Sequence, residues 1–277
     1  MNALSLNGFN GSPWLDQPEN LGGWIDAAAA AGFEYFAPDC PAIAGWLDAG
    51  RTLPQLTARF RSAGTRCQVV TVAAMLDGSP GQRNNLAFAA AAAAALDAPM
   101  LQVNMGVATP AAQLGALEQA CRALEGTGLK LAIEYMPTTP LARLADTLVL
   151  VQSVGTDRAG ALIDIWHHSY DPGGWETLET IPLEAIAYAE FNDAQPRASD
   201  DLAAEMLNRR AMPGEGTLDC ARFANLLAAR GYSGTISVEV LDEEWRARPP
   251  AAFARACHEA TRSFSRQAEA TAPKQRS

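Results

Sequence analysis

The chain has 277 residues, of which 48% are hydrophobic and 19% are charged. This length and composition allow one large buried core and exclude a disordered protein. The formal net charge of −10 excludes the basic stripe that a nucleic-acid partner requires. We therefore expect a folded protein that does not bind nucleic acid.

The first residues, MNALSLNGFNG, contain no basic region followed by an apolar core, so they do not form a signal peptide. The most apolar stretch, residues 86–103, is built of alanine and interrupted by Asp97 and Pro99, which argues against a membrane span. Five scattered cysteines without a CxxC pair predict free, buried thiols. Together these features predict a cytoplasmic protein with no membrane partner.

Short, nearly continuous apolar runs predict eight strands. Strands of this kind are typical of a parallel sheet that is buried on both faces. The predicted strands cover residues 3–9, 33–38, 67–72, 100–105, 130–135, 160–166, 185–191 and 235–241.

The segments between these runs predict helices. Residues 110–124 place Leu114, Leu117, Ala120, Cys121 and Leu124 on one stripe with helical spacing. Residues 217–231 begin with a threonine that could cap a helix and end in a glycine, which commonly stops one.

Eight strand–helix units in this length predict a single-domain (β/α)8 TIM barrel. The rival fold is an open, doubly wound sheet, whose GxGxxG motif after the first strand is missing here. We expect the barrel to span residues 1–267 and residues 268–277 to form a flexible tail.

Four of the predicted strands end in an acid: Glu134, Asp164, Glu190 and Glu239. Taken singly, each could be a salt-bridged or capping loop acid. In a barrel, however, the carboxyl ends of the strands meet at one face, so these four side chains would converge and repel each other. A cation resolves this repulsion, and oxygen ligands favour Mg2+ or Mn2+, whereas an added imidazole favours Mn2+, Co2+ or Zn2+.

Five segments carry a resemblance to a known family: AIEYMP, IDIWHH, EFNDA, MPGEGTLD and GYSGTISVEVL. In this order and spacing they resemble the sugar phosphate isomerase/epimerase group of xylose isomerase-like TIM barrels. That group includes ketose 3-epimerases, inosose isomerases and dehydratases, hydroxypyruvate isomerases and 3-dehydroshikimate dehydratases. The resemblance covers nearly the whole chain and is specific for the superfamily, but it does not identify the substrate.

The resemblance implies one divalent metal held from the fifth to the eighth strand. Glu134, Asp164 and Glu239 match three of the family's ligands. His167, three residues after Asp164, matches a histidine that contacts substrate oxygens in relatives.

The remaining ligand position departs from the family pattern. Relatives carry histidine, or sometimes glutamine, where this chain has Glu190. In one interpretation Glu190 binds the metal as a fourth carboxylate, which favours Mg2+ or Mn2+. In the other, the site has lost strong metal binding and the usual chemistry with it.

The resemblance also implies a reaction. Interconverting a ketose with its epimer or isomer removes a proton from the carbon next to a carbonyl, and a divalent metal polarises that carbonyl. Glu134 and Glu239 would flank the substrate as catalytic carboxylates while also holding the metal. His167 would hydrogen-bond a substrate oxygen; its alternative role is structural.

Several further residues are candidates for substrate contact. Trp14 could form an apolar wall against a sugar, with core packing as the alternative. Arginine is the usual clamp for phosphate or carboxylate, with surface solvation as the alternative for each one here. The candidate clamps are Arg246, after the eighth strand, and Arg197, Arg209 and Arg210, before the PGEG turn.

The other members of the IDIWHH segment have weaker interpretations. Strand alternation would point Trp166 outward, toward helix packing. His168 has no assigned role and is expected to be a loop residue.

The leading hypothesis is a divalent-metal-dependent isomerase or epimerase of a small keto-sugar or polyol. The alternative is a lyase that uses the same site to dehydrate a keto-sugar or keto-inositol, or to eliminate from a 3-keto-glycoside. A non-catalytic sugar-binding barrel is the second alternative, because of the change at Glu190. The partner is a small carbohydrate in each case, and the resemblance allows either a monomer or a homo-oligomer.

Overall fold

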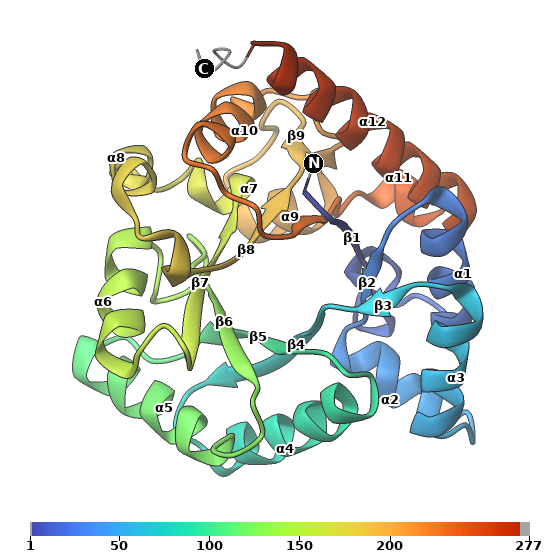
Figure 1. Cartoon of the computed structure of the whole chain (residues 1–277), viewed down its shortest axis with the longest axis horizontal. Helices are drawn as coiled ribbons and strands as arrows, with labels where there is room; N and C mark the ends of the chain where they lie inside the picture. Colours follow the sequence, from blue (N-terminus) through green and yellow to red (C-terminus); the bar gives the residue numbers. More distant parts are fainter. Residues whose placement is uncertain (1, 272–277) are drawn as a thin grey trace, which may run out of the picture.

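The computed structural model describes residues 2–271 and shows one curved sheet of parallel strands enclosed by helices (Figure 1). The strands follow the order β3-β2-β1-β11-β8-β7-β6-β5-β4. They are β1 (Leu4–Asn7), β2 (Tyr35–Ala37), β3 (Arg66–Cys67), β4 (Val69–Leu76), β5 (Met100–Met105), β6 (Lys130–Glu134), β7 (Ala159–Asp164), β8 (Ile186–Phe191) and β11 (Ile236–Val238).

The two ends of this order are neighbours in the chain. Only Gln68 separates β3 from β4, and a parallel bridge between Asp39 and Thr71 links the segment after β2 to β4. Strands β3 and β4 therefore share one position in the barrel, and the sheet comes round on itself with eight positions. The predicted (β/α)8 TIM barrel is confirmed.

The helices form a ring outside the sheet (Figure 1). The last of them, α12, packs against the first, α1, so the two ends of the chain close the ring side by side. The ring consists of α1 (Leu21–Ala31), α2 (Cys40–Asp48), α3 (Leu53–Ala63), α4 (Pro80–Ala95), α5 (Pro110–Ala123), α6 (Leu144–Val154), α8 (Gly174–Thr180), α10 (Cys220–Ala229) and α12 (Pro250–Thr271).

Local sequence explains where these helices begin. Thr109 caps α5 by accepting a hydrogen bond from the amide of Ala112, and proline follows at the first helical position. The predicted stripe of α5 packs against the core, with Leu114 only partly buried. For α10 the predicted cap was wrong: Asp219 caps the helix, while the Thr217 hydroxyl donates to the carbonyl of Ala194.

The core has two parts. The larger part lies between the sheet and the helix ring and contains the five cysteines, all free and buried as expected. The smaller part fills the barrel interior with side chains from six different strands, so the barrel is a packed core rather than a pore. Its members are Ala37, Val69, Met100, Ala132, Leu162 and Tyr188.

The structure departs from the sequence prediction in two segments. The connection after β8 contains a two-stranded sheet, β9 (Asp193–Ala194) with β10 (Arg210–Ala211), and a short helix, α9 (Leu202–Asn208), none of which was predicted. At the carboxyl end, α12 continues to Thr271, so residues 268–271 are helical rather than tail; residues 272–277 lie outside the described residues. Among residues 2–271, no helix is long and apolar enough to cross a membrane.

Candidate active site

The four acids predicted at the strand ends do converge. Glu134 and Asp164 are the last residues of β6 and β7, Glu190 lies near the end of β8, and Glu239 directly follows β11. All four are buried, and one oxygen of each lies within 4.8 Å of the others. This donor set of carboxylate oxygens is the kind that a divalent cation takes. The residues present therefore fit a metal.

One buried arginine lies among these acids. Nη1 of Arg210 is 2.5 Å from Oδ2 of Asp164 and 3.0 Å from Oε2 of Glu239, and the side chain is only 1% exposed. The alternative that this arginine is solvated at the surface was wrong, and its partners are acids of the protein rather than an anionic ligand. Its backbone belongs to β10, where its amide donates to the carbonyl of Leu241, and this pairing directs the side chain inward.

Amide side chains satisfy the remaining acid oxygens. Asn7, at the end of β1, donates to Glu190 at 3.0 Å and to Glu239 at 2.8 Å, and thus bridges two like charges. Asn192 donates to Oδ1 of Asp164 at 2.8 Å. Hydrogen bonds of this kind reduce the cost of burying carboxylates.

Glu134 is positioned from β5. Gln102 and Asn104 donate to its Oε2 at 2.7 and 2.9 Å. The Gln102 side chain is itself fixed, because its oxygen accepts the amide of Val72 at 2.6 Å. Val72 has a φ of +52° at an irregularity in the β4–β5 register. For a β-branched residue this conformation costs on the order of 1–3 kcal/mol.

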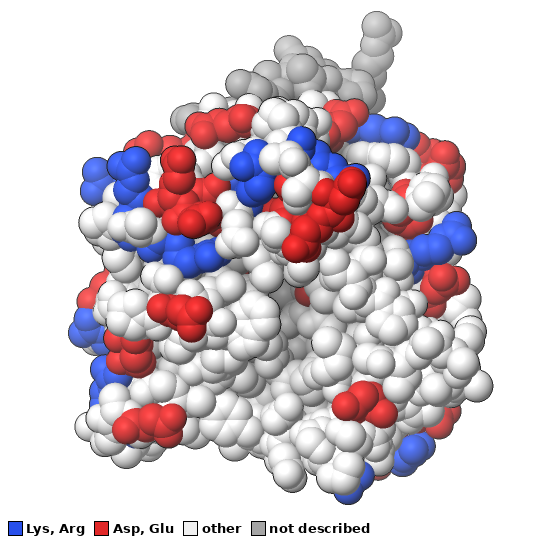
Figure 2. All heavy atoms as spheres, turned by 180° about the vertical axis from the view of Figure 1, so that it is seen from behind, with Lys and Arg blue, Asp and Glu red and all other residues white. Residues whose placement is uncertain are grey.

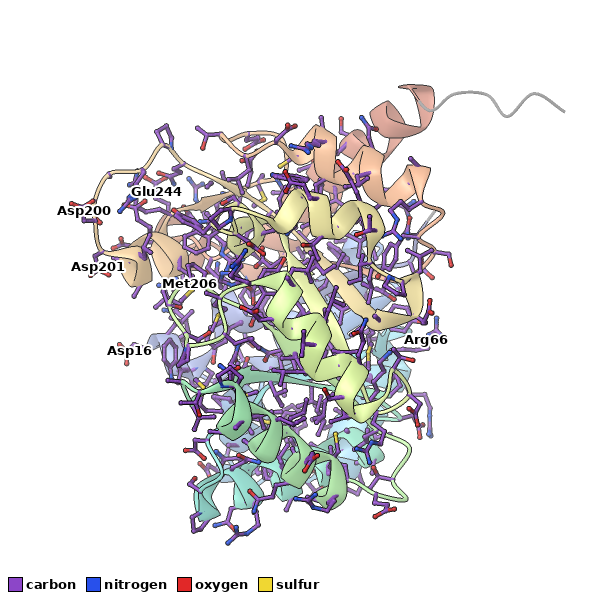
Figure 3. All side chains as sticks on the ribbon, turned by 90° about the vertical axis from the view of Figure 1, so that its left-hand side faces the viewer. Asp16, Arg66, Asp200, Asp201, Met206 and Glu244 are labelled. Carbon is purple, nitrogen blue, oxygen red and sulfur yellow. The ribbon has the colours of Figure 1, made fainter. Side chains whose placement is uncertain are left out.

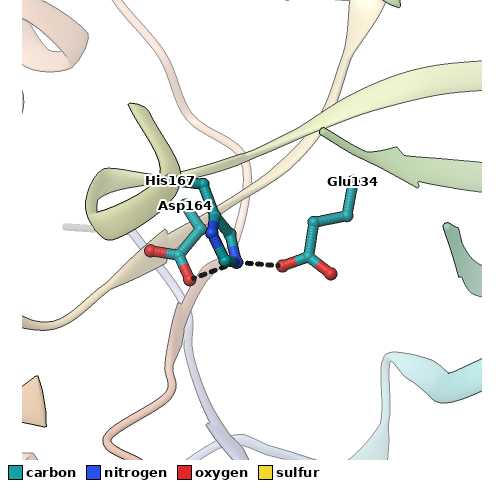
Figure 4. A group of neighbouring side chains, drawn as sticks. All are labelled: Glu134, Asp164 and His167. Carbon is teal, nitrogen blue, oxygen red and sulfur yellow. Dashed lines mark ion pairs between the residues drawn. The ribbon is translucent and has the colours of Figure 1, made fainter. Parts of the chain in front are cut away.

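The two adjacent histidines lie in α7 (Ile165–His168), a single turn that Asp164 caps. Nε2 of His167 is 3.2 Å from Oε1 of Glu134 and 3.7 Å from Oδ2 of Asp164 (Figure 4). His167 therefore lies between two of the acids, on the cavity side. A second group that could hold a cation consists of these same three residues.

His168 faces away from the acids and is a buried packing residue, not a loop residue. Its Nδ1 pairs with the Tyr135 hydroxyl at 2.8 Å, and its ring packs edge-on against Trp175. Burial lowers the pKa of His168 to about 4, so the ring is neutral at pH 7. Strand alternation predicted that Trp166 points outward, toward helix packing. The strand ends before this residue, so the alternation does not apply to it, and its ring lies against the rings of His167 and Tyr170.

The charges around the acids shift their pKa values in opposite directions. Burial and three neighbouring carboxylates raise the pKa of Glu190 well above its ordinary value. Burial also raises the pKa of Glu239, to about 8, although Arg210 opposes the shift. Burial acts in the same sense on Asp164, but Arg210, His167 and hydrogen bonds outweigh it and lower its pKa. One arginine thus offsets only part of the negative charge that the four acids carry when all are ionised.

Three of the acids, Glu134, Glu190 and Glu239, line the bottom of a cavity of about 340 Å3, whereas Asp164 is fully buried and does not line it. Its floor is polar and its upper wall is mostly apolar. Figure 2 looks onto the barrel end to which the strand ends point, and its centre is hollowed and surrounded by uncharged residues. The polar floor consists of Asn7, Gln102, Asn104, Glu134, His167, Glu190, Arg210 and Glu239.

The candidates for substrate contact separate into two groups. Trp14 and His167 line the cavity. Arg197 and Arg246 do not: Arg197 is paired with Asp200 at the surface, and Arg246 donates to Asn208 and to the carbonyl of Leu207. Neither arginine is available to an anion in the cavity.

Sequence reasoning missed the amides, and it named Arg210 only as one of four candidate clamps for an anion, not as a partner of the acids. Asn7 and Asn104 lie at strand ends, so the argument that selected the acids could have selected them also. Asn192 is two residues from Glu190 and carried a similar signal. Nothing in the sequence distinguished Arg210 from the other three candidate arginines, because it reaches the acids only through an irregular connection after β8.

Comparison with curated proteins finds partial matches. The chain is 26% identical over 120 residues to the inosose isomerase of Halalkalibacterium halodurans, covering 43% of this chain and 42% of that protein. It is 30% identical over 105 residues to a 3-dehydroshikimate dehydratase of Pseudomonas aeruginosa, covering 38% of this chain and 16% of that protein. These matches thus span less than half of either relative.

Comparison with solved structures finds the same fold over almost the whole chain. A crystal structure of the IOLI protein with a zinc atom has a TM-score of 0.84 at 16% identity and covers 96% of this chain and 98% of its own. An L-ribulose 3-epimerase has a TM-score of 0.73 at 15% identity and full coverage of both chains. The model of one family matches residues 25–262. The chain belongs to the xylose isomerase-like TIM barrel family.

Proposed function

We propose that this protein is a divalent-metal-dependent isomerase or epimerase of a small keto-sugar or polyol. The observation that carries the proposal is the group of four buried acids, three of which line the bottom of a cavity large enough for a small ligand. The activities of the family relatives named above, which are isomerases, epimerases and dehydratases, support it.

Glu134, Asp164, Glu190 and Glu239 would hold the metal. When bound, a divalent ion polarises a carbonyl and makes the neighbouring C–H more acidic. The acid-rich donor set favours Mn2+ or Mg2+, while His167 nearby keeps Co2+ and Zn2+ in consideration. Zinc in the similar IOLI structure agrees with a site for a divalent ion.

The chain's own groups supply the proton chemistry. Glu134 accepts hydrogen bonds from two amides and faces the cavity, so it is placed to take a proton from the carbon next to the carbonyl. Glu239 comes from β11, three strands away in the sheet, and is placed to return a proton from the other side. His167 would hydrogen-bond a substrate oxygen between them.

The test combines metal analysis with proton exchange. Purified protein should contain a divalent metal, and in D2O it should introduce deuterium next to the carbonyl of a neutral ketose. Glu134→Gln should abolish the exchange, whereas Glu118→Gln, a matched change in an exposed acid of α5, should not. Absence of both metal and exchange would overturn the proposal and leave a non-catalytic sugar-binding barrel.

The same test separates isomerase from lyase. Elimination begins with the same proton abstraction but then expels a hydroxyl or an aglycone from the adjacent carbon. Recovery of a deuterated epimer or isomer supports the isomerase, whereas loss of water or of an aglycone supports the lyase. The partial matches to dehydratases keep this alternative in the test.

A further inference from the structure

The cavity opens through a ring of apolar side chains. Only three large hydrophobic side chains in residues 2–264 are strongly exposed, and two of them, Trp14 at 56% and Met75 at 46%, line this cavity. The third, Val149, lies on α6. Exposed apolar groups that gather at one pocket mark a binding surface. We therefore expect these residues to bind an apolar group of a ligand.

Side chains from the segment after β1, the end of β4, the segment after β6 and α9 form this ring, which we call the apolar mouth: Phe9, Trp14, Met75, Met136, Met206 and Leu207. The rings of Phe9 and Trp14 pack with centroids 5.5 Å apart and present a joint aromatic face. Methionine side chains adapt to varied apolar shapes. Figure 3 places Met206 at the end of the barrel opposite Arg66, which begins β3 and so marks the amino ends of the strands.

The charges at the same end oppose an anionic ligand. Among the described residues that line the cavity, Arg210 is the only lysine or arginine, and Asp164 and Glu239 already hold its guanidinium. Figure 3 shows Asp16, Asp200, Asp201 and Glu244 at the same end of the barrel as Met206, and of these Asp200 is paired with Arg197. A phosphate or carboxylate that reached the floor would meet three carboxyl groups and no cation that is not already paired.

We infer that the substrate is neutral and that its keto-sugar or polyol part carries an apolar substituent, such as an aryl group. The hydroxylated part would reach the polar floor, and the apolar group would pack against Trp14 and Met75. The cavity of about 340 Å3 lies at the lower end of the range of about 300–1,000 Å3 for small-molecule pockets, so it has room for a sugar with a small substituent. This inference rests on the proposed function for placing the sugar at the floor.

Equilibrium binding tests the inference without turnover. The probes are two pairs that differ in one feature: phenyl β-glucoside against methyl β-glucoside, and glucose 6-phosphate against glucose. Isothermal titration of the full-length protein should show phenyl β-glucoside binding about tenfold more tightly than the methyl compound. Glucose 6-phosphate should bind no more tightly than glucose.

Variants at the mouth should remove the preference for the phenyl group. In Trp14→Ser combined with Met75→Ser, the ratio of the two glucoside affinities should fall toward one. Both positions are exposed, so the protein should fold normally, and circular dichroism checks this. Val149→Ser, the matched change in the third exposed apolar residue, should keep the wild-type ratio.

Two results would overturn the inference: equal affinities of the two glucosides for the wild-type protein, or tighter binding of glucose 6-phosphate than of glucose. An unchanged ratio in the double variant would do so as well. Failure of the proposed function looks different, because it removes metal binding and deuterium exchange while the phenyl preference persists.

Discussion

The floor and the mouth of the cavity are built in opposite ways. The floor is buried and charged, and its side chains come from the ends of β6, β7, β8 and β11 together with amides from β1 and β5. The mouth is exposed and apolar, and most of its side chains come from loops and from α9. Rigid strands thus place the groups that perform chemistry, whereas connections supply the surface that selects a ligand.

The largest expected effect concerns the floor. Glu134→Gln keeps the shape of the side chain but removes the group that accepts a proton, so proton exchange should fall by roughly a thousandfold, within the range for a general base. Single-turnover exchange in D2O measures this loss. A fall of less than tenfold, with normal folding, would assign the proton transfer to another group.

The next prediction separates two neighbouring arginines. Arg210→Met leaves buried carboxylates without their cation and should destabilise the metal-free protein by about 3–5 kcal/mol. Arg209→Met removes a pair between a partly exposed guanidinium and the buried Glu205, whose other oxygen still accepts two backbone amides, and should cost less, about 1 kcal/mol. Urea unfolding in the presence of a chelator measures both values.

Added Mn2+ should recover part of the stability lost in Arg210→Met, because a bound cation that prefers the folded state stabilises it. Equal stability of the two arginine variants without metal would contradict the role of Arg210 as the resident cation of the floor.

A third prediction concerns the support behind the floor. The pKa of His168 is about 4 when folded, against 6.5 as its ordinary value. Between these two pH values His168 binds more protons in the unfolded chain than in the folded chain. Its contribution to the free energy of unfolding is therefore fully present above pH 6.5 and is lost as the pH drops toward 4. The difference between the two pKa values corresponds to about 3 kcal/mol in the free energy of unfolding.

His168→Gln should flatten this part of the stability profile. Urea midpoints of wild-type and variant protein between pH 4 and 7.5 provide the comparison. Parallel curves would show that acid lability arises elsewhere.

The smallest effect is expected at Glu190. Because an imidazole at this position restores the family pattern, Glu190→His should bind Zn2+ or Co2+ as tightly as the wild-type protein or more tightly. Competition with a fluorescent chelator measures the affinities. A complete loss of activity with metal still bound would instead show that Glu190 acts as an acid or base.

Much of the floor could be predicted because its residues follow a local rule. A run of buried apolar residues that ends in an acid places that acid at the carboxyl end of a barrel strand, and this rule found Glu134, Asp164, Glu190 and Glu239. The same rule applies to Asn7 and Asn104, but an amide carries no charge that demands explanation, so these positions drew no attention.

The arginines show where such reasoning stopped. No feature of the sequence separates Arg210 from the other candidate clamps, Arg197, Arg209 and Arg246. Of the four, only Arg210 is paired with β9 and directed into the floor. The two-stranded sheet that does this joins segments 16 residues apart through short, irregular pieces. No periodicity marks such pieces, because each is shorter than one repeat of a strand or helix pattern.

The sequence by itself determined the barrel and the four acids, because hydrophobic periodicity and strand ends are local properties of the chain. Only the tertiary structure decided which arginine neutralises the acids, what His168 packs against, and that the cavity opens through an apolar mouth. These features depend on the packing of connections against one another, where the contacts join residues far apart in the chain.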